Sequence, residues 1–268
     1  MFKVTRILFA LLLLWALALT AHAAPLRMAT TTSTQNSGLL DLLLPAFQKK
    51  TGIEVHVIAV GTGKALKMGR DGDVDVVMVH AENAEKKFVS DGYGVDRIQF
   101  MYNDFVLVGP KNDPAAIKHL PSVTSALAAI REKQIKFVSR GDDSGTHKKE
   151  RSLWAAANIK PAGSWYIEAG QGMGKVLQMA SELDAYTLTD RGTWLAYKDK
   201  LDMALLNAGD AKLSNPYGII AVDPKRHADT NYADAKRLID WVSSQEAQQL
   251  IKGYRLHGEP LFIPLLLN

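Results

Sequence analysis

Cysteine is absent from this sequence of 268 residues. A chain without cysteine has no disulfide framework, no thiolate metal site and no cysteine nucleophile. It also has no residue on which a lipid anchor could be built after a leader peptide. Disulfide-rich secreted domains, thiolate zinc proteins and anchored lipoproteins are therefore excluded.

A marked excess of charge of either sign is absent too. The 32 basic and 28 acidic residues are interspersed along the chain and leave a net charge of +4. Proteins that bind nucleic acid normally carry a concentrated basic face, so we expect no nucleic-acid partner. The histidines lack the spacing of metal ligands, and the glycine-rich stretches 61–64 and 170–175 do not fit a nucleoside-triphosphate loop. We expect no metal and no cofactor.

Long apolar runs are scarce, and the one that stands out is at the N-terminus. Residues 7–19 are apolar, Lys3 and Arg6 precede them, and Ala21-His22-Ala23 follows as a small-x-small cleavage pattern. This arrangement predicts a signal peptide over residues 1–23, cleaved near Ala23. The mature charge is then 30 − 28 = +2. An exported protein without an anchor is retained only by a second membrane, which predicts the periplasm.

The remainder of the chain alternates between short apolar stretches and amphipathic ones. Apolar runs predict strands at 26–29, 53–60, 73–79, 98–108, 135–139, 165–168, 184–189 and 217–222. Helical spacing predicts helices at 39–52, 64–70, 81–90, 122–132, 146–158, 174–181, 192–197 and 233–254. Such alternation indicates an α/β fold with mainly parallel sheets covered by helices.

Two long apolar strands, near residues 100 and 220, each end in a turn that contains proline. We interpret them as the connections that carry the chain from one lobe to a second and back. Lobe one then comprises residues 24–104 and 218–268, and lobe two comprises residues 105–217.

Four predicted strand-to-helix turns are rich in hydroxyl groups and glycine. In open α/β sheets such turns meet beyond the carboxyl ends of the strands. Short hydroxyl donors, accessible backbone amides and helix N-termini suit an anion. The candidate ligand-binding residues are Thr31, Thr32, Ser33, Thr62, Gly63, Arg140, Ser144, Gly145, Thr146, Arg191, Gly192 and Thr193.

The same residues also have a purely structural interpretation. Ser, Thr and Asp before a helix are ordinary N-caps. Arg140 could pair with Asp142 or Asp143, and Arg191 with Asp190. A guanidinium is nevertheless what a buried dianion requires, because an unpaired charge is costly to remove from water. Both roles are compatible, since an aspartate can orient an arginine that contacts the anion.

Ser144 and His147 are three residues apart and raise the alternative of a secreted serine hydrolase. No strained nucleophile turn surrounds Ser144, and no third group is evident that would orient the histidine. We therefore expect no catalytic residues and no enzymatic activity.

Taken together, these turns resemble one family, and the likeness extends over essentially the whole mature chain. The chain resembles the substrate-binding component of the Tup-type tungstate ABC transporter, a type II periplasmic binding protein. The stretches that carry the resemblance are 29–34 (ATTTST), 60–63 (VGTG), 137–147 (FVSRGDDSGTH), 186–193 (YTLTDRGT) and 258–262 (GEPLF).

The resemblance implies two α/β lobes joined by two hinge strands, which close around a tetrahedral oxyanion. It implies that the hydroxyl run, Arg140 and residues 144–146 surround tungstate, which is then delivered to an ABC permease driven by a separate ATPase. A monomer is the natural expectation for such a receptor. A sensor that docks on a receptor is an alternative with the same ligand.

Molybdate and phosphate remain alternative ligands. Molybdate has nearly the shape of tungstate, so the residues do not separate the two. Hydrogen phosphate carries a proton and favours a carboxylate acceptor, which Asp142 or Asp143 could supply.

Overall fold

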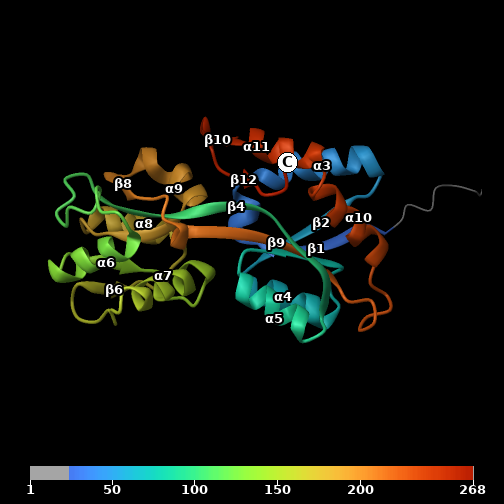
Figure 1. The fold of residues 1–268 in the computed structure, drawn as a ribbon, viewed down its shortest axis with the longest axis horizontal. Helices are drawn as coiled ribbons and strands as arrows, with labels where there is room; N and C mark the ends of the chain where they lie inside the picture. Colours follow the sequence, from blue (N-terminus) through green and yellow to red (C-terminus); the bar gives the residue numbers. More distant parts are fainter. Residues whose placement is uncertain (1–23, 268) are drawn as a thin grey trace, which may run out of the picture.

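The computed structural model describes residues 24–267, which form two α/β lobes connected by two long strands (Figure 1). The predicted signal peptide, residues 1–23, lies outside the described residues. Between residues 24 and 267, no helix is both long enough and apolar enough to cross a membrane.

The first lobe is built on three parallel strands, with β1 in the middle. β1 (Leu26–Thr31) pairs in parallel with β2 (Val55–Val60) and with β3 (Val76–Val79). β9 (Ser214–Val222) continues this sheet antiparallel to β3, and β4 (Gly94–Pro110) pairs antiparallel with β9. The helices of this lobe are α2 (Thr32–Asn36), α3 (Leu39–Thr51), α4 (Thr62–Asp71), α5 (Glu82–Ser90), α10 (Tyr232–Val242) and α11 (Gln245–Gly253).

Alternation along the strands explains why helices cover both faces of this sheet. Successive side chains of a strand point to opposite faces. Met28 packs in one core cluster together with Phe47 of α3 and Leu238 of α10, whereas the next residue, Ala29, packs in another with Ala65 of α4. Figure 1 shows the result, with α3, α10 and α11 on one side of the strands and α4 and α5 on the other.

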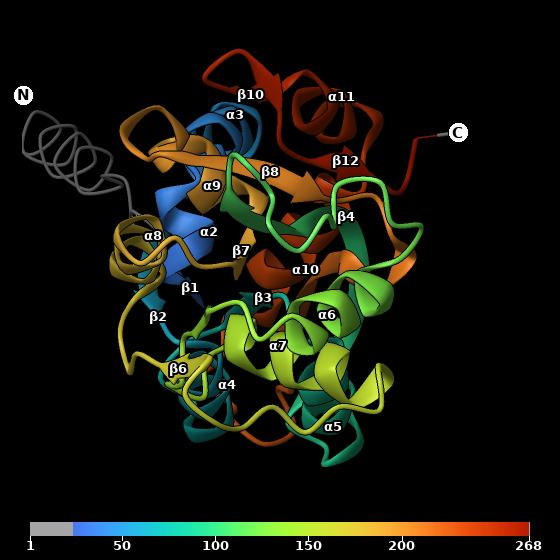
Figure 2. The same cartoon turned by 90° about the vertical axis from the view of Figure 1, so that its left-hand side faces the viewer.

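The second lobe lies around the far ends of the long strands (Figure 1) and faces the viewer in Figure 2. β7 (Thr187–Asp190) and β8 (Met203–Asn207) pair antiparallel with the last part of β4, and β5 (Phe137–Ser139) pairs in parallel with β6 (Tyr166–Glu168). The helices here are α6 (Val123–Glu132), α7 (Gly145–Ala156), α8 (Met173–Glu182) and α9 (Arg191–Tyr197), with the short 3-10 turns η1 (Lys198–Lys200) and η2 (Ala211–Leu213).

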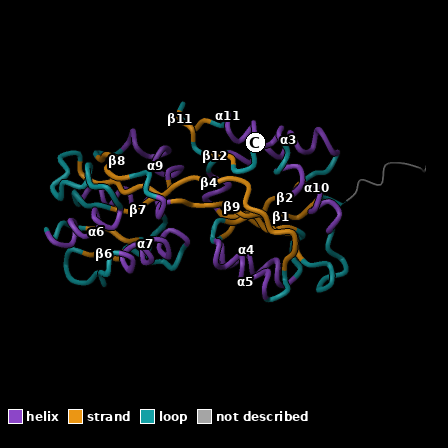
Figure 3. The backbone as a smooth tube through the Cα atoms, viewed as in Figure 1, coloured by secondary structure: helices purple, strands orange, loops and turns teal. Residues whose placement is uncertain are grey.

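β4 and β9 are the two strands that run between the lobes (Figure 3). β4 pairs with β9 from Gly94 to Asp104 and then, from Phe105 onwards, with β7 and β8. The predicted fold class, two α/β lobes joined by two long strands, is confirmed. The pairings of β4 and β9 are antiparallel, while β1, β2 and β3 form the parallel part.

The C-terminal part differs from the expectation of one amphipathic helix over 233–254. The structure divides it into α10 and α11, because Ser244 begins a new helix by accepting a hydrogen bond from the backbone amide of Ala247. Pro45 lies inside α3, which nevertheless continues to Thr51. The sequence patterns also missed α2, β8 and the two-residue strands β10 (Arg255–Leu256), β11 (Glu259–Pro260) and β12 (Ile263–Pro264).

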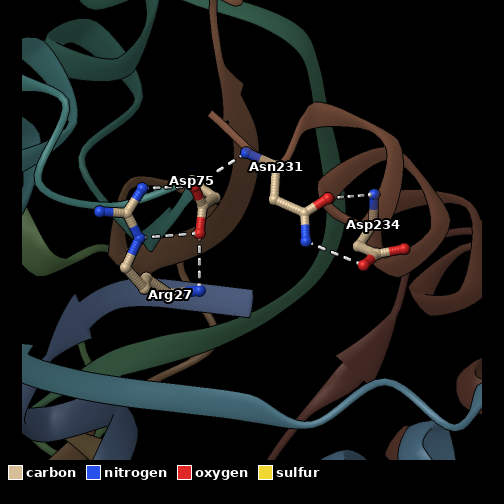
Figure 4. Close-up of polar contacts among 4 residues, drawn as sticks. All are labelled: Arg27, Asp75, Asn231 and Asp234. Atoms are coloured by element: carbon tan, nitrogen blue, oxygen red, sulfur yellow. Dashed lines mark hydrogen bonds and ion pairs between the residues drawn. The ribbon is translucent and has the colours of Figure 1, made fainter. Parts of the chain in front are cut away.

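A buried carboxylate ties three elements of the first lobe together (Figure 4). Asp75, just before β3, accepts hydrogen bonds from the backbone amide, Nε and Nη2 of Arg27 at 2.8, 3.1 and 2.7 Å. It also accepts one from the backbone amide of Asn231 at 3.0 Å, and Asn231 in turn caps α10. Burial by itself raises the pKa of Asp75, but these hydrogen bonds bring it below its ordinary value.

Candidate oxyanion-binding site

A cavity of about 590 Å³ lies where the ends of several strands meet the starts of helices. Its wall combines segments that precede β4 in the sequence with segments that lie between β4 and β9. The two groups of segments belong to different lobes. The cavity therefore lies beyond the carboxyl ends of β1, β2, β5 and β7, which precede the four turns named from the sequence, and also beyond that of β3.

The hydroxyl run after β1 divides into structural and cavity-facing members. Thr30 donates to the carbonyl oxygen of Met78 at 2.8 Å, and Thr34 is fully buried. Thr31 caps α2, since its Oγ1 accepts from the backbone amide of Thr34 at 3.1 Å. Oγ1 of Thr31 also lies 3.1 Å from Oγ of Ser33. Thr31, Thr32 and Ser33 line the cavity, so the run supplies both a cap and hydroxyl groups to the pocket.

The loop after β5 holds Arg140 at the cavity wall. Nη2 of Arg140 donates to Oδ2 of Asp142 at 2.5 Å, and Oδ1 of Asp142 accepts from the backbone amide of Ser144 at 3.1 Å. Burial raises the pKa of Asp142, but the hydrogen bonds from Ser144 and the charge of Arg140 lower it overall. Among the described residues, Nε of Arg140 has no acceptor although it is buried. A buried N–H without a partner is unusual and marks a place where an acceptor would be stabilising.

The shape of this loop depends on a glycine. Gly141 has a φ of +61°, and a Cβ built there would lie 2.9 Å from Cβ of Glu168. The left-handed conformation and the close approach both disfavour any larger residue. The turn directs the chain into α7, whose N-terminal residues Ser144, Gly145 and Thr146 line the cavity.

In the turn after β7, the helix-capping Asp190 lines the cavity but Arg191 does not. Asp190 caps α9, accepting from the backbone amide of Thr193 at 2.9 Å and from Oγ1 of Thr193 at 2.6 Å. Arg191 instead forms a bidentate ion pair with Asp104 of β4, at 2.5 Å from Nε and 2.6 Å from Nη2. The hydrogen bond to Asp104 raises the pKa of Arg191. The sequence interpretation that paired Arg191 with Asp190 is wrong about the partner, which lies 87 residues away.

His80 is part of the cavity wall, and the sequence analysis did not select it. It directly follows β3, with Nδ1 3.1 Å from Oδ1 of Asn215 and Nε2 3.1 Å from both Oγ of Ser33 and Oγ1 of Thr31. Burial lowers its pKa. The available signal was its position, because it is the first polar residue after an apolar strand whose carboxyl end faces the site.

The structure brings together all but two of the predicted site residues. Gly63, the second residue of α4, and Arg191 are not among the residues that line the cavity. Those that do are Thr31, Thr32, Ser33, Thr62, Arg140, Ser144, Gly145, Thr146, Gly192 and Thr193. Besides His80 and Asp190, the cavity wall includes the segment 171–175 and Tyr197, which the sequence patterns do not indicate. The segment 171–175 is part of a glycine-rich stretch that does not fit a nucleotide-binding loop.

The geometry around Ser144 does not assemble a nucleophile. Oγ of Ser144 accepts from the backbone amide of His147 at 3.3 Å and so caps α7. The ring Nδ1 of His147 accepts from the backbone amide of Asp143 at 3.0 Å. A catalytic serine needs its hydroxyl hydrogen-bonded to a basic ring nitrogen. Residues 24–267 also contain no group of three or more His, Asp or Glu side chains placed to hold a metal ion.

Comparisons with known proteins agree with this architecture. A model of the PBP superfamily domain matches residues 19–246. The tungstate-binding protein TupA of Peptoclostridium acidaminophilum is 52% identical over 241 residues, which cover 88% of this chain and 84% of that protein.

Two solved structures extend the likeness to three dimensions. TupA from Desulfovibrio alaskensis G20 superposes with a TM-score of 0.85 at 46% identity, covering 91% of this chain and all of that one. A structure described as the tungstate ABC transporter from Geobacter sulfurreducens has a TM-score of 0.79 at 56% identity, with coverage of 86% and 98%. Because the fold is shared, the sequence identity is high and the coverage is nearly complete, this chain belongs to the family of the tungstate-binding proteins TupA, within the PBP superfamily.

Proposed function

We propose that this protein is the periplasmic substrate-binding component of an ABC transporter and that it captures tungstate. The observation that carries the proposal is the convergence of hydroxyl groups, helix N-termini and a guanidinium on one cavity between the lobes. Thr31 and Ser33 come from the first lobe, and Arg140 and Ser144 from the second. A doubly charged oxyanion replaces its hydration shell with such donors, and charge-assisted hydrogen bonds are the strongest of them.

The ligand contacts are proposed for the residues that line the cavity, namely Thr31, Thr32, Ser33, Thr62, Arg140, Ser144, Gly145, Thr146, Gly192 and Thr193. We leave Gly63 and Arg191 out of this set, since Arg191 is engaged by Asp104. Nε of Arg140, which has no acceptor within residues 24–267, supports its assignment as the central contact.

The carboxylates around the cavity favour an acceptor-only anion over hydrogen phosphate. Asp142 and Asp143 do not line the cavity, and Asp142 already accepts from Arg140 and Ser144. Asp190 does line it, and its two oxygens accept from the amide and hydroxyl of Thr193. The choice of tungstate over molybdate rests on the relatives, which are described as tungstate-binding proteins.

The mechanism we propose is closure of the two lobes about β4 and β9. Lobe one comprises residues 24–104 and 218–268, and lobe two residues 105–217, so donors from both sides surround the anion only in the closed state. A ligand that binds the closed state more tightly shifts the population towards it. The closed monomer then presents the surface that a permease with a separate ATPase recognises. A signal peptide cleaved near Ala23 would bring the protein to the periplasm.

Competition calorimetry on the mature chain tests the proposal. Tungstate should bind with a free energy of about −9 to −12 kcal/mol, which is submicromolar affinity. Molybdate should compete strongly, and sulfate and phosphate weakly, because sulfate is smaller and hydrogen phosphate needs an acceptor. Millimolar binding of tungstate at neutral pH would contradict the proposal, and tighter binding of phosphate would replace its ligand.

A further inference from the structure

His80 stands at the end of a chain of side-chain amides that determines which ring nitrogen carries the hydrogen. Nδ2 of Asn215 donates to Oδ1 of Asn103 at 2.7 Å. Oδ1 of Asn215 is therefore the atom that faces Nδ1 of His80, at 3.1 Å. An amide oxygen only accepts, so Nδ1 must carry a hydrogen. In the neutral ring, Nε2 is then a lone-pair acceptor.

That acceptor points at the hydroxyl groups that the anion needs. Nε2 of His80 lies 3.1 Å from Oγ of Ser33 and 3.1 Å from Oγ1 of Thr31. Each hydroxyl has a single hydrogen to donate. While the ring is neutral, a hydroxyl that donates to Nε2 has no hydrogen left for the cavity. Tungstate accepts hydrogen bonds but cannot donate them, so the neutral ring and the anion compete for the same hydrogen.

The charges around His80 allow the ring to change state. Burial lowers its pKa, and the Asp190 carboxylate at the start of α9 opposes this effect. The ring of Tyr217 on β9 lies 4.8 Å away, centroid to centroid, and burial keeps that phenol neutral by raising its pKa. Arg140, which lines the same cavity, adds a positive charge. Lys175 of α8 also lines the cavity and adds a second positive charge, whereas Gly145 of α7, which lies close to the ring, is uncharged.

We propose that His80 takes up a proton from solvent when the oxyanion binds, and that its Nε2–H then donates to the hydroxyl groups of Ser33 and Thr31. The hydroxyl hydrogen that had been donated to Nε2 is then free to turn into the cavity and donate to the anion, which remains a dianion. This inference rests on the proposed function of the cavity. His80 is a positioning residue in this scheme, because it acts through the hydroxyl groups, and it compensates part of the charge that the ligand introduces.

The proposal fixes the sign of the pH dependence. In the free protein burial holds the pKa of His80 below its ordinary value, and a bound dianion raises that pKa. Between the free and bound values the affinity should increase as the pH falls, by up to about tenfold for each pH unit. At pH values above the bound pKa or below the free pKa, the affinity should not change with the state of this group.

The test is tungstate calorimetry on the mature protein from about pH 6 to about pH 9, in pairs of buffers with different ionisation enthalpies. The wild type should take up as much as one proton per anion inside this window. His80→Gln keeps an amide near the position of Nε2 but cannot titrate, so its affinity should vary less with pH and its proton uptake should vanish. His56→Gln, at an exposed histidine on β2, is the matched control and should behave as wild type.

The outcomes separate this inference from the proposed function. No binding of tungstate by the wild type at any pH would refute the function itself. Binding without proton uptake, or unchanged uptake in His80→Gln, would overturn only the role of His80. Should His80→Gln fail to fold, Asn215→Asp serves instead, because a carboxylate facing Nδ1 raises the pKa of His80 and should move the pH-dependent range upwards. An unmoved profile in folded Asn215→Asp would also overturn the inference.

Discussion

Replacing Arg140 with glutamine is the most direct test of how the cavity binds its ligand. The change removes the guanidinium but keeps a planar amide of shorter reach. In the structure, one N–H of Arg140, at Nη2, is committed to Asp142, while Nε is buried and lacks an acceptor within the described part of the chain. The side chain is 20% exposed, so it is held at the wall rather than free in solvent.

The expected loss follows from the hydrogen bonds that glutamine cannot make. Hydrogen bonds to a charged group contribute about 1.5 to 3 kcal/mol each, and neutral ones about 0.5 to 1.5 kcal/mol. Losing two charge-assisted bonds to the anion and recovering one neutral bond costs about 1.5 to 5.5 kcal/mol. The dissociation constant for tungstate should therefore increase by about 10-fold to about 10,000-fold.

Isothermal titration of the mature protein measures this change, with thermal unfolding of the ligand-free variant as a check on folding. Arg237→Gln makes the same change of charge on the exposed face of α10 and should leave the affinity as in wild type. Arg140→Lys should lie between wild type and glutamine, because lysine keeps the charge without the planar fork. A dissociation constant for Arg140→Gln within about threefold of wild type would refute the role given to this arginine, since about 0.7 kcal/mol is less than one such bond.

Three further variants test the surrounding assignments. Arg191→Gln breaks the ion pair with Asp104 and should lower the free energy of unfolding by about 1 kcal/mol. Its affinity for tungstate should stay within a few-fold of the wild-type affinity. A loss of affinity as large as that of Arg140→Gln would show that Arg191 belongs to the binding site. Asp75→Asn should make the free energy of unfolding less dependent on pH in the acid range. The pKa of Asp75 is depressed by Arg27, so its contribution to stability is present above the unfolded pKa and is lost as the pH falls through the folded pKa. Acid titration followed by circular dichroism measures this, and an equal acid response in the variant would contradict it. Ser144→Ala removes a helix cap and should lower the free energy of unfolding by about 1 kcal/mol. We expect no ester hydrolysis by the wild type or by this variant. Measurable hydrolysis by the wild type that is lost in Ser144→Ala would support the enzyme alternative.

Much of the fold could be predicted because its signals are local. The apolar runs of β1 and β3 and the helical spacing in α3 and α6 are each contained in a few residues. Residues that cap helices just after strands likewise indicate the carboxyl edge of a sheet, where ligands bind. The shortest elements could not be predicted in this way. α2 lies within the run of hydroxyl residues and has no apolar periodicity, and β10, β11 and β12 are only two residues long.

Most of the predicted site residues line one cavity, but the sequence did not identify every residue of its wall. Arg140 and Arg191 have similar places in the sequence, because each directly follows a strand and is in turn followed by a helix or begins one. Only the packing of α9 against β4 shows that Arg191 is committed to Asp104. His80 was set aside as one of several scattered histidines, because its partner Asn215 lies 135 residues further along the chain.

By itself, the sequence determined the periodicity of the elements, the positions of their caps and the chemical character of the loops that follow the strands. These depend on interactions within one or two turns of chain, where local propensity and hydrogen bonding dominate. The tertiary structure alone decided which of those loops share a cavity, which arginine faces it and which histidine joins it. Such choices depend on contacts between residues far apart in the chain, and those contacts exist only once the lobes have packed around β4 and β9.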